Sequence, residues 1–279
     1  MSPEVTVLMS VYNGERYLRE SIESILNQTF SDFEFLIIND GSTDSSREII
    51  LSYDDPRIIL VDNEENMGLA KSLNGGIHRA RGEYIARQDA DDISHPLRFE
   101  KEFEHMKKNK CDVVCCRYQY IDKRGKKLRK VSDLFYKENI FQLLVSYKDP
   151  IAHGSVLMKK NVLQSVGEYN ELLVYAQDFE LWLRLLNKRK KIECVDYVGY
   201  FFRYLTSLNR EKKQYFNKIA SLIINNHNTR NSMFNNEIAS FNDSFIARKK
   251  QEYNIIFFFV AELNYWYNIM KIQLKGMLS

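Results

Sequence analysis

A chain of 279 residues with 44% hydrophobic and 13% aromatic side chains can bury a full core, which excludes an intrinsically disordered protein. No apolar run approaches the ~20 residues that span a bilayer and no apolar signal region precedes the first predicted strand, so we expect a cytoplasmic protein. The net charge of +3 is unevenly distributed: residues 203–279 carry 11 Lys and Arg against 5 Asp and Glu, while residues 1–202 carry 29 against 32. A basic, aromatic-rich end indicates binding to an anionic membrane or a lipid pyrophosphate more than to nucleic acid.

The first part of the chain alternates predicted strands with predicted helices. Leu18, Ile22 and Ile25 recur on one helical face directly after the apolar strand 5–11. The remaining elements are strands at 33–38, 57–61 and 84–88 and a helix at 68–80. This alternation predicts the α/β fold class, with a mostly parallel central sheet and helices on both faces. The loops after the first, second and fourth strands should then gather at one edge of the sheet, where such folds bind ligands.

The second part continues with less regular elements and ends in a basic segment. The predicted elements are a helix through 99–106, a strand at 111–116, hairpin arms at 118–121 and 126–131, a helix at 136–146, a strand at 155–158 and a helix at 177–187. Residues 206–279 predict two or three helices. Lysines flank an apolar, aromatic stretch at 255–270, a pattern that fits a helix at a membrane interface or one packed on the catalytic domain or a partner.

Cysteine and histidine patterns do not predict a metal site. The cysteines contain no C-x-x-C pair, and three of them share one apolar run, so we expect reduced thiols in the core: Cys111, Cys115, Cys116 and Cys194. Four histidines are scattered without metal-ligand spacing and are expected at the surface or in helix packing: His78, His95, His105 and His227.

Three aspartates follow the strand at 84–88. Asp89 and Asp91 stand at positions i and i+2, so an extended backbone would point both side chains into one cavity, with Asp92 turned away. Two convergent carboxylates repel each other unless a cation or a strong donor lies between them. A divalent ion shared with substrate phosphates is the usual solution. The alternative interpretation is a solvated turn that caps the next helix.

Several blocks of sequence resemble the family 2 glycosyltransferases, whose fold is called GT-A. The matching blocks are VTVLMSVYNG (5–14), IINDGSTD (37–44), NMGLA (66–70) with Asn74, RARGEYI (79–85), DADD (89–92) and QDFELWLRL (177–185). They keep the family's order and cover about the first 200 residues. The resemblance implies a GT-A nucleotide-sugar-binding and catalytic domain at 1–205, followed by a helical, basic and aromatic-rich segment at 206–279.

The resemblance also implies a binding site for a nucleotide sugar. It assigns contacts with the donor to Val11, Tyr12, Asn13, Asp40, Arg81, Asp89, Ala90, Asp91, Ser155 and Arg203. Within this set, Val11, Tyr12 and Asn13 line the nucleoside pocket, Asp40 accepts hydrogen bonds from the base or ribose, Arg81 contacts the diphosphate or base edge, and Ser155 contacts the transferred sugar. Alternatively, Asp40 supports its own turn and Arg81 ends a helix.

The metal and the catalytic base follow from the same resemblance. Asp91, supported by Asp89, should hold Mn²⁺ or Mg²⁺. Relatives often add a histidine shortly after an aromatic-Arg pair, but Leu205 occupies that place here, which leaves water or phosphate as the third ligand and Arg203 to neutralise the diphosphate. Asp178 should be the base that deprotonates the acceptor hydroxyl, although an aspartate that stabilises the start of a helix is the alternative.

These residues predict an inverting glycosyltransferase. It would move a hexose from a UDP-sugar to a hydroxyl of a lipid-linked glycan acceptor in surface polysaccharide or lipopolysaccharide synthesis, with peripheral contact at the cytoplasmic face of the membrane. Two alternatives stay open. One is a sugar nucleotidyltransferase that releases pyrophosphate, and the other is a catalytically degenerate glycosyltransferase that serves as a scaffold.

Overall fold

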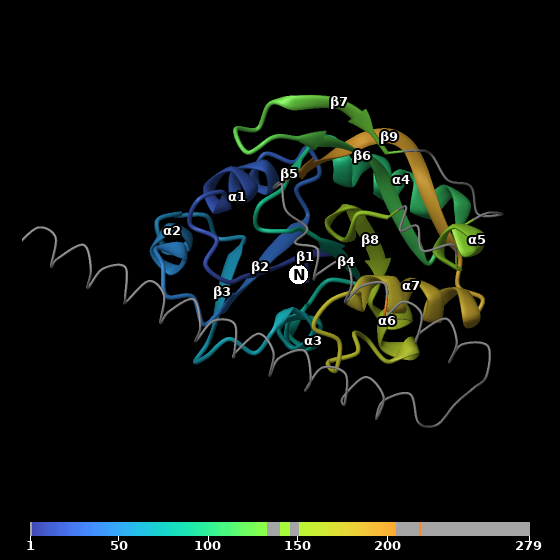
Figure 1. The fold of residues 1–279 in the computed structure, drawn as a ribbon, viewed down its shortest axis with the longest axis horizontal. Coiled ribbons are helices and arrows are strands. Elements are labelled where there is room, and N and C mark those ends of the chain that lie inside the picture. The colour runs from blue at the N-terminus through green and yellow to red at the C-terminus, as the bar shows by residue number, and fades with distance from the viewer. Residues whose placement is uncertain (1, 133–139, 146–150, 205–217, 219–279) are drawn as a thin grey trace, which may run out of the picture. The chain divides into compact units, whose positions relative to one another are not determined.

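The computed structural model describes residues 2–132, 140–145, 151–204 and 218 (Figure 1). The backbone divides into two units, Met1–Asn228 and Thr229–Ser279, and every described residue belongs to the first. The predicted C-terminal helices and the predicted domain boundary at residue 205 therefore lie outside the described residues, apart from Lys218. Within the described part, no helix is both long and apolar enough to cross a membrane.

The secondary structure alternates through the first half as predicted. The strands are β1 (Val5–Val11), β2 (Phe33–Asp40), β3 (Ile58–Asn63), β4 (Tyr84–Arg87), β5 (Ile93–Ser94), β6 (Val113–Ile121), β7 (Lys127–Val131), β8 (Val156–Lys159) and β9 (Ile192–Arg203). The helices are α1 (Leu18–Leu26), α2 (Ser46–Leu51), α3 (Leu69–Arg79), α4 (Arg98–Asn109), α5 (Ile140–Val145), α6 (Lys160–Val166) and α7 (Gln177–Asn187), with a 3-10 turn at His153–Ser155.

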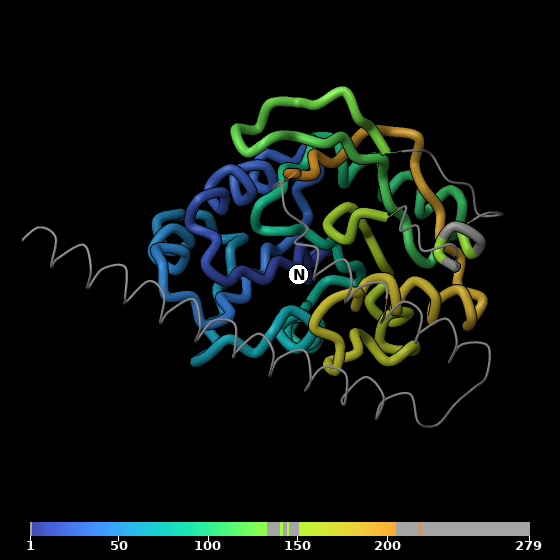
Figure 2. The backbone as a smooth tube through the Cα atoms, in the orientation of Figure 1, coloured from blue at the N-terminus to red at the C-terminus, as the bar shows by residue number. Residues whose placement is uncertain are grey.

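One sheet organises the described chain, in the order β3-β2-β1-β4-β8-β6-β9-β5, with β7 paired to β6. Strands β3, β2, β1 and β4 are parallel, β8 is antiparallel to both β4 and β6, and β9 is parallel to β6. Strands β1, β2, β4, β6 and β9 therefore all end at one edge of the sheet, here called the carboxyl edge, and β8 begins there. Figure 2 shows β9, in orange, following β6, in green.

Helices cover both faces of the sheet. Val7 and Met9 of β1 belong to a buried cluster that includes residues of α1 and α4. Leu8 points the other way, because side chains alternate along a strand. It meets α3 so closely that a Cβ on Gly76 would lie 2.4 Å from the Leu8 Cδ1 atom. The predicted α/β class, with helices on both faces, is confirmed (Figure 1).

Some elements were not predicted from the sequence. β9 has no counterpart among the predicted elements, yet it runs beside β6 for most of its length. The short helices α2 and α6 were also missed. The predicted strand at 111–116 and the first hairpin arm are one continuous strand, β6, and the second arm is β7.

Candidate active site

The acidic loop, defined as residues 89–92, follows β4 at the carboxyl edge. It is a tight turn and not an extension of the strand, since the backbone N–H of Asp92 donates to the carbonyl of Asp89 at 3.3 Å. Asp92 is buried and accepts a hydrogen bond from the backbone N–H of Arg203 at 2.6 Å. Asp92 is thus turned away as predicted, whereas Asp89, Ala90 and Asp91 stay partly exposed.

The carboxylates of this loop differ in charge balance. Burial tends to raise the pKa of Asp89, but the charge and hydrogen bond of the fully buried Arg87, together with the nearby His153 and Arg98, outweigh it, so the pKa falls below its usual value. Burial and the charge of Asp89 raise the pKa of Asp91 to about 6. Among the described residues no side chain donates a hydrogen bond to the Asp91 carboxylate, and the charges of Arg203 and Arg87 offset the rise in its pKa only in part. Oxygen ligands of this kind suit Mg²⁺ or Mn²⁺, and the loop therefore fits the predicted metal.

Asp178 begins α7 and belongs to the same electrostatic site. Its Oδ1 accepts the backbone N–H of Phe179 at 2.8 Å, as expected near a helix N-terminus. Burial raises the pKa of Asp178, and the negative charge of Asp89 raises it further, while Arg87 opposes the rise. The carboxylates of Asp178 and Asp89 therefore lie close enough to influence each other.

The turn before β8 closes one side of the acidic loop. A Cβ on Gly154 would lie 1.8 Å from the Tyr200 hydroxyl oxygen and 2.9 Å from Oδ2 of Asp89, so only glycine fits this contact. His153 is buried beside it, with Nε2 at 2.8 Å from the Tyr169 hydroxyl oxygen. Burial and the charge of Arg87 lower the pKa of His153 to about 3, so the imidazole is neutral at physiological pH.

Ser155 lies in the same turn. Its side chain is fully buried, and its hydroxyl donates to the carbonyl of Ala152 at 2.8 Å. Contact between Ser155 and the transferred sugar stays a prediction. The contact of this turn with Asp89 is made by Gly154.

The predicted nucleoside pocket lies where β1 and β2 end. Val11 is buried, the Tyr12 side chain is 49% exposed, and Asn13 has a positive φ of 52°. Oδ1 of Asn13 accepts the backbone N–H of Thr43 at 2.8 Å, which ties the two loops together. The exposed Tyr12 ring is free to meet a flat ligand.

Asp40 supports the loop behind this pocket. Its carboxylate accepts hydrogen bonds at 2.7–3.0 Å from the side chains of Asn63 and Ser72 and from the backbone N–H groups of Met67 and Gly68. Asp40 therefore has the structural role that the sequence allowed, but it stabilises the segment 63–72 and not its own turn. Contact with a base or ribose stays a prediction.

Two predicted arginines are engaged elsewhere. Arg81 precedes β4 and donates to Glu34 near the start of β2, about 20 Å along that strand from Asp40 at the carboxyl edge. A contact between Arg81 and the nucleotide stays a prediction, and it would need Arg81 to leave Glu34. Arg203 reaches the acidic loop, where its buried guanidinium donates to the Asp91 carbonyl at 2.6 Å and to Glu20 at 2.7 Å, so it positions the loop. Contact between Arg203 and a diphosphate stays a prediction.

Comparison with known proteins decides the family. The profile of Glycosyl transferase family 2 matches residues 6–166, more than half of the chain. The chain belongs to glycosyl transferase family 2. An uncharacterised glycosyltransferase of Methanocaldococcus jannaschii is 35% identical over 221 residues, covering 75% of this chain and 76% of that protein. The glycosyltransferase EpsE of Bacillus subtilis is 34% identical over 192 residues, covering 67% and 68%. The chain spans 59% of a similar protein of Rickettsia typhi.

Solved structures support the fold of this family 2 glycosyltransferase. TarS of S. aureus, crystallised with UDP-GlcNAc, superposes with a TM-score of 0.65 at 17% identity and covers 85% of this chain and 70% of its own. The mannosyltransferase PcManGT of Pyrobaculum calidifontis, in complex with GDP-Man and Mn²⁺, has a TM-score of 0.61 at 17% identity and covers 83% and 66%. These likenesses confirm the predicted GT-A fold.

Sequence reasoning missed the residue that links the site. Arg87 lies in β4 two positions before Asp89, is fully buried, and influences the pKa values of Asp89, His153 and Asp178. A charged residue inside an otherwise apolar strand was the available signal, because a buried charge needs a partner.

Proposed function

We propose that this glycosyltransferase moves a hexose from a UDP-sugar to a hydroxyl of a glycan acceptor, with inversion at the anomeric carbon and with a divalent metal. The observation that carries the proposal is the position of Asp89, whose charge raises the pKa of both Asp91 and Asp178. A cation-binding carboxylate and a candidate base thereby share one electrostatic environment.

Asp91, with Asp89 beside it, would hold Mn²⁺ or Mg²⁺. The ion would stabilise the negative charge that builds on the departing nucleoside diphosphate. Arg87 fixes the orientation of Asp89 through their ion pair, and Arg203 fixes the Asp91 backbone. The complexes of TarS with UDP-GlcNAc and of PcManGT with GDP-Man and Mn²⁺ support a nucleotide-sugar donor and a metal of this kind.

The nucleoside would lie over the ends of β1 and β2. There Val11 and Tyr12 offer apolar contact, and Asn13 holds the two loops together. Asp40 supports the loop from below through its four hydrogen bonds and could contact the base or ribose only by exchanging one of them.

Asp178 would take the proton from the acceptor hydroxyl while that oxygen attacks the anomeric carbon. A carboxylate with a raised pKa is a stronger base than an exposed one, and Asp178 has such a pKa. His153 does not compete for this role, because its pKa of about 3 makes it a poor base. The hydroxyl of Ser155 is bonded to a backbone carbonyl, which removes a serine–histidine nucleophile from consideration.

The acceptor is proposed to be lipid-linked, with peripheral contact at the cytoplasmic face of the membrane. The support is chemical: residues 203–279 carry 11 basic against 5 acidic residues and are rich in aromatic side chains. A lipid pyrophosphate presents the complementary negative charge.

Asp178→Asn tests the assignment, with the exposed Asp196→Asn as the matched control. Transfer should fall by about 10²–10⁴-fold, the usual contribution of a general base. UDP affinity should be unchanged, because Asp178 would act on the acceptor. Retained turnover in the variant would refute the role of Asp178.

The identity of the released product separates the alternatives. Free UDP from wild-type enzyme supports glycosyl transfer, whereas pyrophosphate would indicate a nucleotidyltransferase. Complete absence of both transfer and UDP-sugar hydrolysis with Mn²⁺, across a panel of UDP-sugars, would favour the scaffold.

A further inference from the structure

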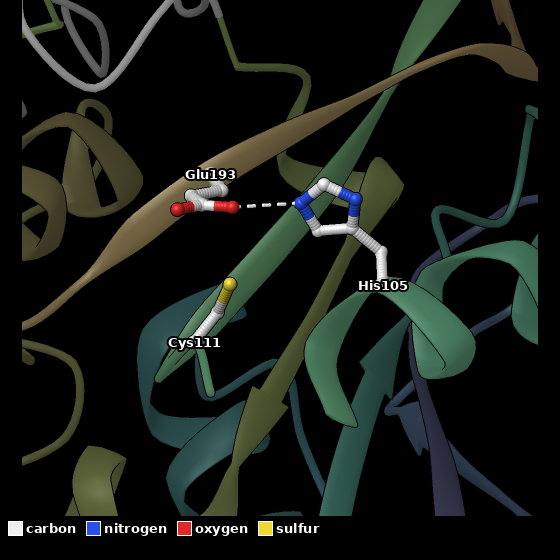
Figure 3. Close-up of side chains that lie close together, drawn as sticks. All are labelled: His105, Cys111 and Glu193. Carbon is white, nitrogen blue, oxygen red and sulfur yellow. Dashed lines mark hydrogen bonds and ion pairs between the residues drawn. The ribbon is translucent and has the colours of Figure 1, made fainter. Parts of the chain in front are cut away.

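A second cluster of ligand-type side chains lies far from the acidic loop. His105 of α4, Cys111 just before β6 and Glu193 of β9 place one potential ligand atom each within 4.8 Å of one another (Figure 3). β6 and β9 both begin near this cluster and end at the carboxyl edge. β6 itself extends about 25 Å from its start near this cluster to its end at the carboxyl edge.

The three donors form a set that zinc prefers. Zn²⁺ takes thiolate sulfur, imidazole nitrogen and carboxylate oxygen, whereas the all-oxygen acidic loop suits harder ions. His105 Nε2 already lies 2.8 Å from Oε2 of Glu193, and the sulfur of Cys111 lies beside this pair in Figure 3.

Access and support are both present around the cluster. The sulfur side is closed, because Cys111 is fully buried, while the side chains of His105 and Glu193 are 26% and 16% exposed, so an ion can enter from their side. Lys191 holds the other Glu193 oxygen, Oε1, at 2.9 Å, which fixes the carboxylate with Oε2 facing His105. Such outer partners orient metal ligands.

We propose that His105, Cys111 and Glu193 form a Zn²⁺ site that joins α4 to the starts of β6 and β9. Three protein ligands leave a fourth position for water. On binding, the Cys111 thiol releases its proton to solvent, and the His105–Glu193 hydrogen bond is replaced by two bonds to the ion. The sequence spacing did not indicate this site, because its ligands come from three separate elements.

The site would brace a strand that serves the acidic loop. β9 ends at Arg203, whose backbone N–H holds Asp92 and whose guanidinium holds the Asp91 carbonyl. Zinc would anchor the opposite end of that strand to α4 and β6. Its effect on glycosyl transfer would thus be structural and would not depend on the proposed donor or acceptor.

Cobalt substitution provides the sharpest test. Full-length protein stripped of metal is titrated with Co²⁺, and absorption is followed in the near ultraviolet, where thiolate-to-cobalt charge transfer gives a band that a purely carboxylate site cannot produce. We expect a band that saturates at one equivalent and disappears when Zn²⁺ is added. Cys111→Ser should abolish the band, whereas Cys194→Ser, on the neighbouring partly exposed thiol, should retain it.

Zinc affinity, measured by competition with a chromogenic chelator, provides the second readout. Loss of a group that only orients a metal ligand weakens metal binding by about 10–100-fold. Loss of the sulfur ligand itself should therefore weaken zinc binding by about 100-fold or more. Zn²⁺ should raise the melting temperature of the wild type but not that of Cys111→Ser. If Cys111→Ser does not fold, His105→Gln, at a partly exposed position, gives the same comparison.

Two outcomes would overturn the proposal. One is the absence of a sulfur band when wild-type protein is saturated with Co²⁺. The other is a band, or tight zinc binding, that survives in both Cys111→Ser and His105→Gln, because the ion would then be held elsewhere.

Discussion

Asp91 carries a charge that the metal-free protein does not balance. Burial and the neighbouring Asp89 raise its pKa from 3.8 to about 6. Since one pKa unit is worth about 1.4 kcal/mol, ionised Asp91 costs the metal-free fold about 3 kcal/mol at neutral pH. Asp91→Asn removes the charge with little change in shape, so we expect the variant to be more stable than wild type by up to that amount at pH 7.5.

The sign of the pH dependence follows from the same pKa. An acid whose pKa is higher in the folded state than in the unfolded state destabilises the fold when it ionises. The penalty is absent below about pH 4 and fully present above about pH 6. Lowering the pH from 7.5 to 5 should therefore stabilise wild-type protein without metal more than it stabilises Asp91→Asn.

Urea unfolding in the presence of a chelator measures this difference. The matched control is Asp54→Asn at an exposed position, which should change the free energy of unfolding by less than about 0.5 kcal/mol. Mn²⁺ with UDP should stabilise the wild type and leave Asp91→Asn unaffected. If Asp91→Asn proves no more stable than Asp54→Asn at pH 7.5, or still binds UDP in a metal-dependent way, the reasoning about Asp91 is wrong.

Three further substitutions test the supports of the site. Gly154→Ala places a methyl group against the Tyr200 hydroxyl and should cost about 3 kcal/mol in urea unfolding, with reduced transfer. Arg203→Met removes the guanidinium that donates to the Asp91 carbonyl and to Glu20 but keeps the backbone N–H that holds Asp92, so it should cost about 3 kcal/mol and weaken UDP binding in calorimetry. Arg98 and Glu102 form a fully buried ion pair, so Arg98→Leu leaves Glu102 without its partner and should cost about 3–5 kcal/mol. Adding Glu102→Leu should recover most of this loss. Equal melting temperatures for the single and double variants would contradict this expectation.

The sequence predicted the elements whose periodicity is strong. β1 and α7 have the predicted bounds, because Val5–Val11 is one apolar run and α7 carries a clear apolar stripe. β9 was missed because polar residues such as Glu193 and Asp196 interrupt it and only four of its twelve residues are buried. Its strand state comes from pairing with β6, which a local pattern does not reveal.

Side-chain partners across elements were the least predictable part of the site. The position of Arg81 beside Glu34 depends on the order and direction of β1, β2 and β4. A motif position says only where a residue stands along the chain. Burial of Ser155 and the assembly of the His105 cluster likewise follow from packing between elements far apart in sequence.

Strand direction explains why the acidic loop acquires its particular neighbours. If β8 ran parallel to β4, its end would face the loop, and the turn at Gly154 would lie at the opposite edge. Because β8 is antiparallel, its start meets Asp89 instead, and only glycine leaves room there. β6 and β9 then recover the direction of β4, which brings Arg203 back to the loop from the other side. The reversal at β8 thus brings two separate segments, the Gly154 turn and Arg203, to the acidic loop, while Arg87 of β4 itself pairs with Asp89 and leaves Asp91 without a side-chain hydrogen-bond donor among the described residues.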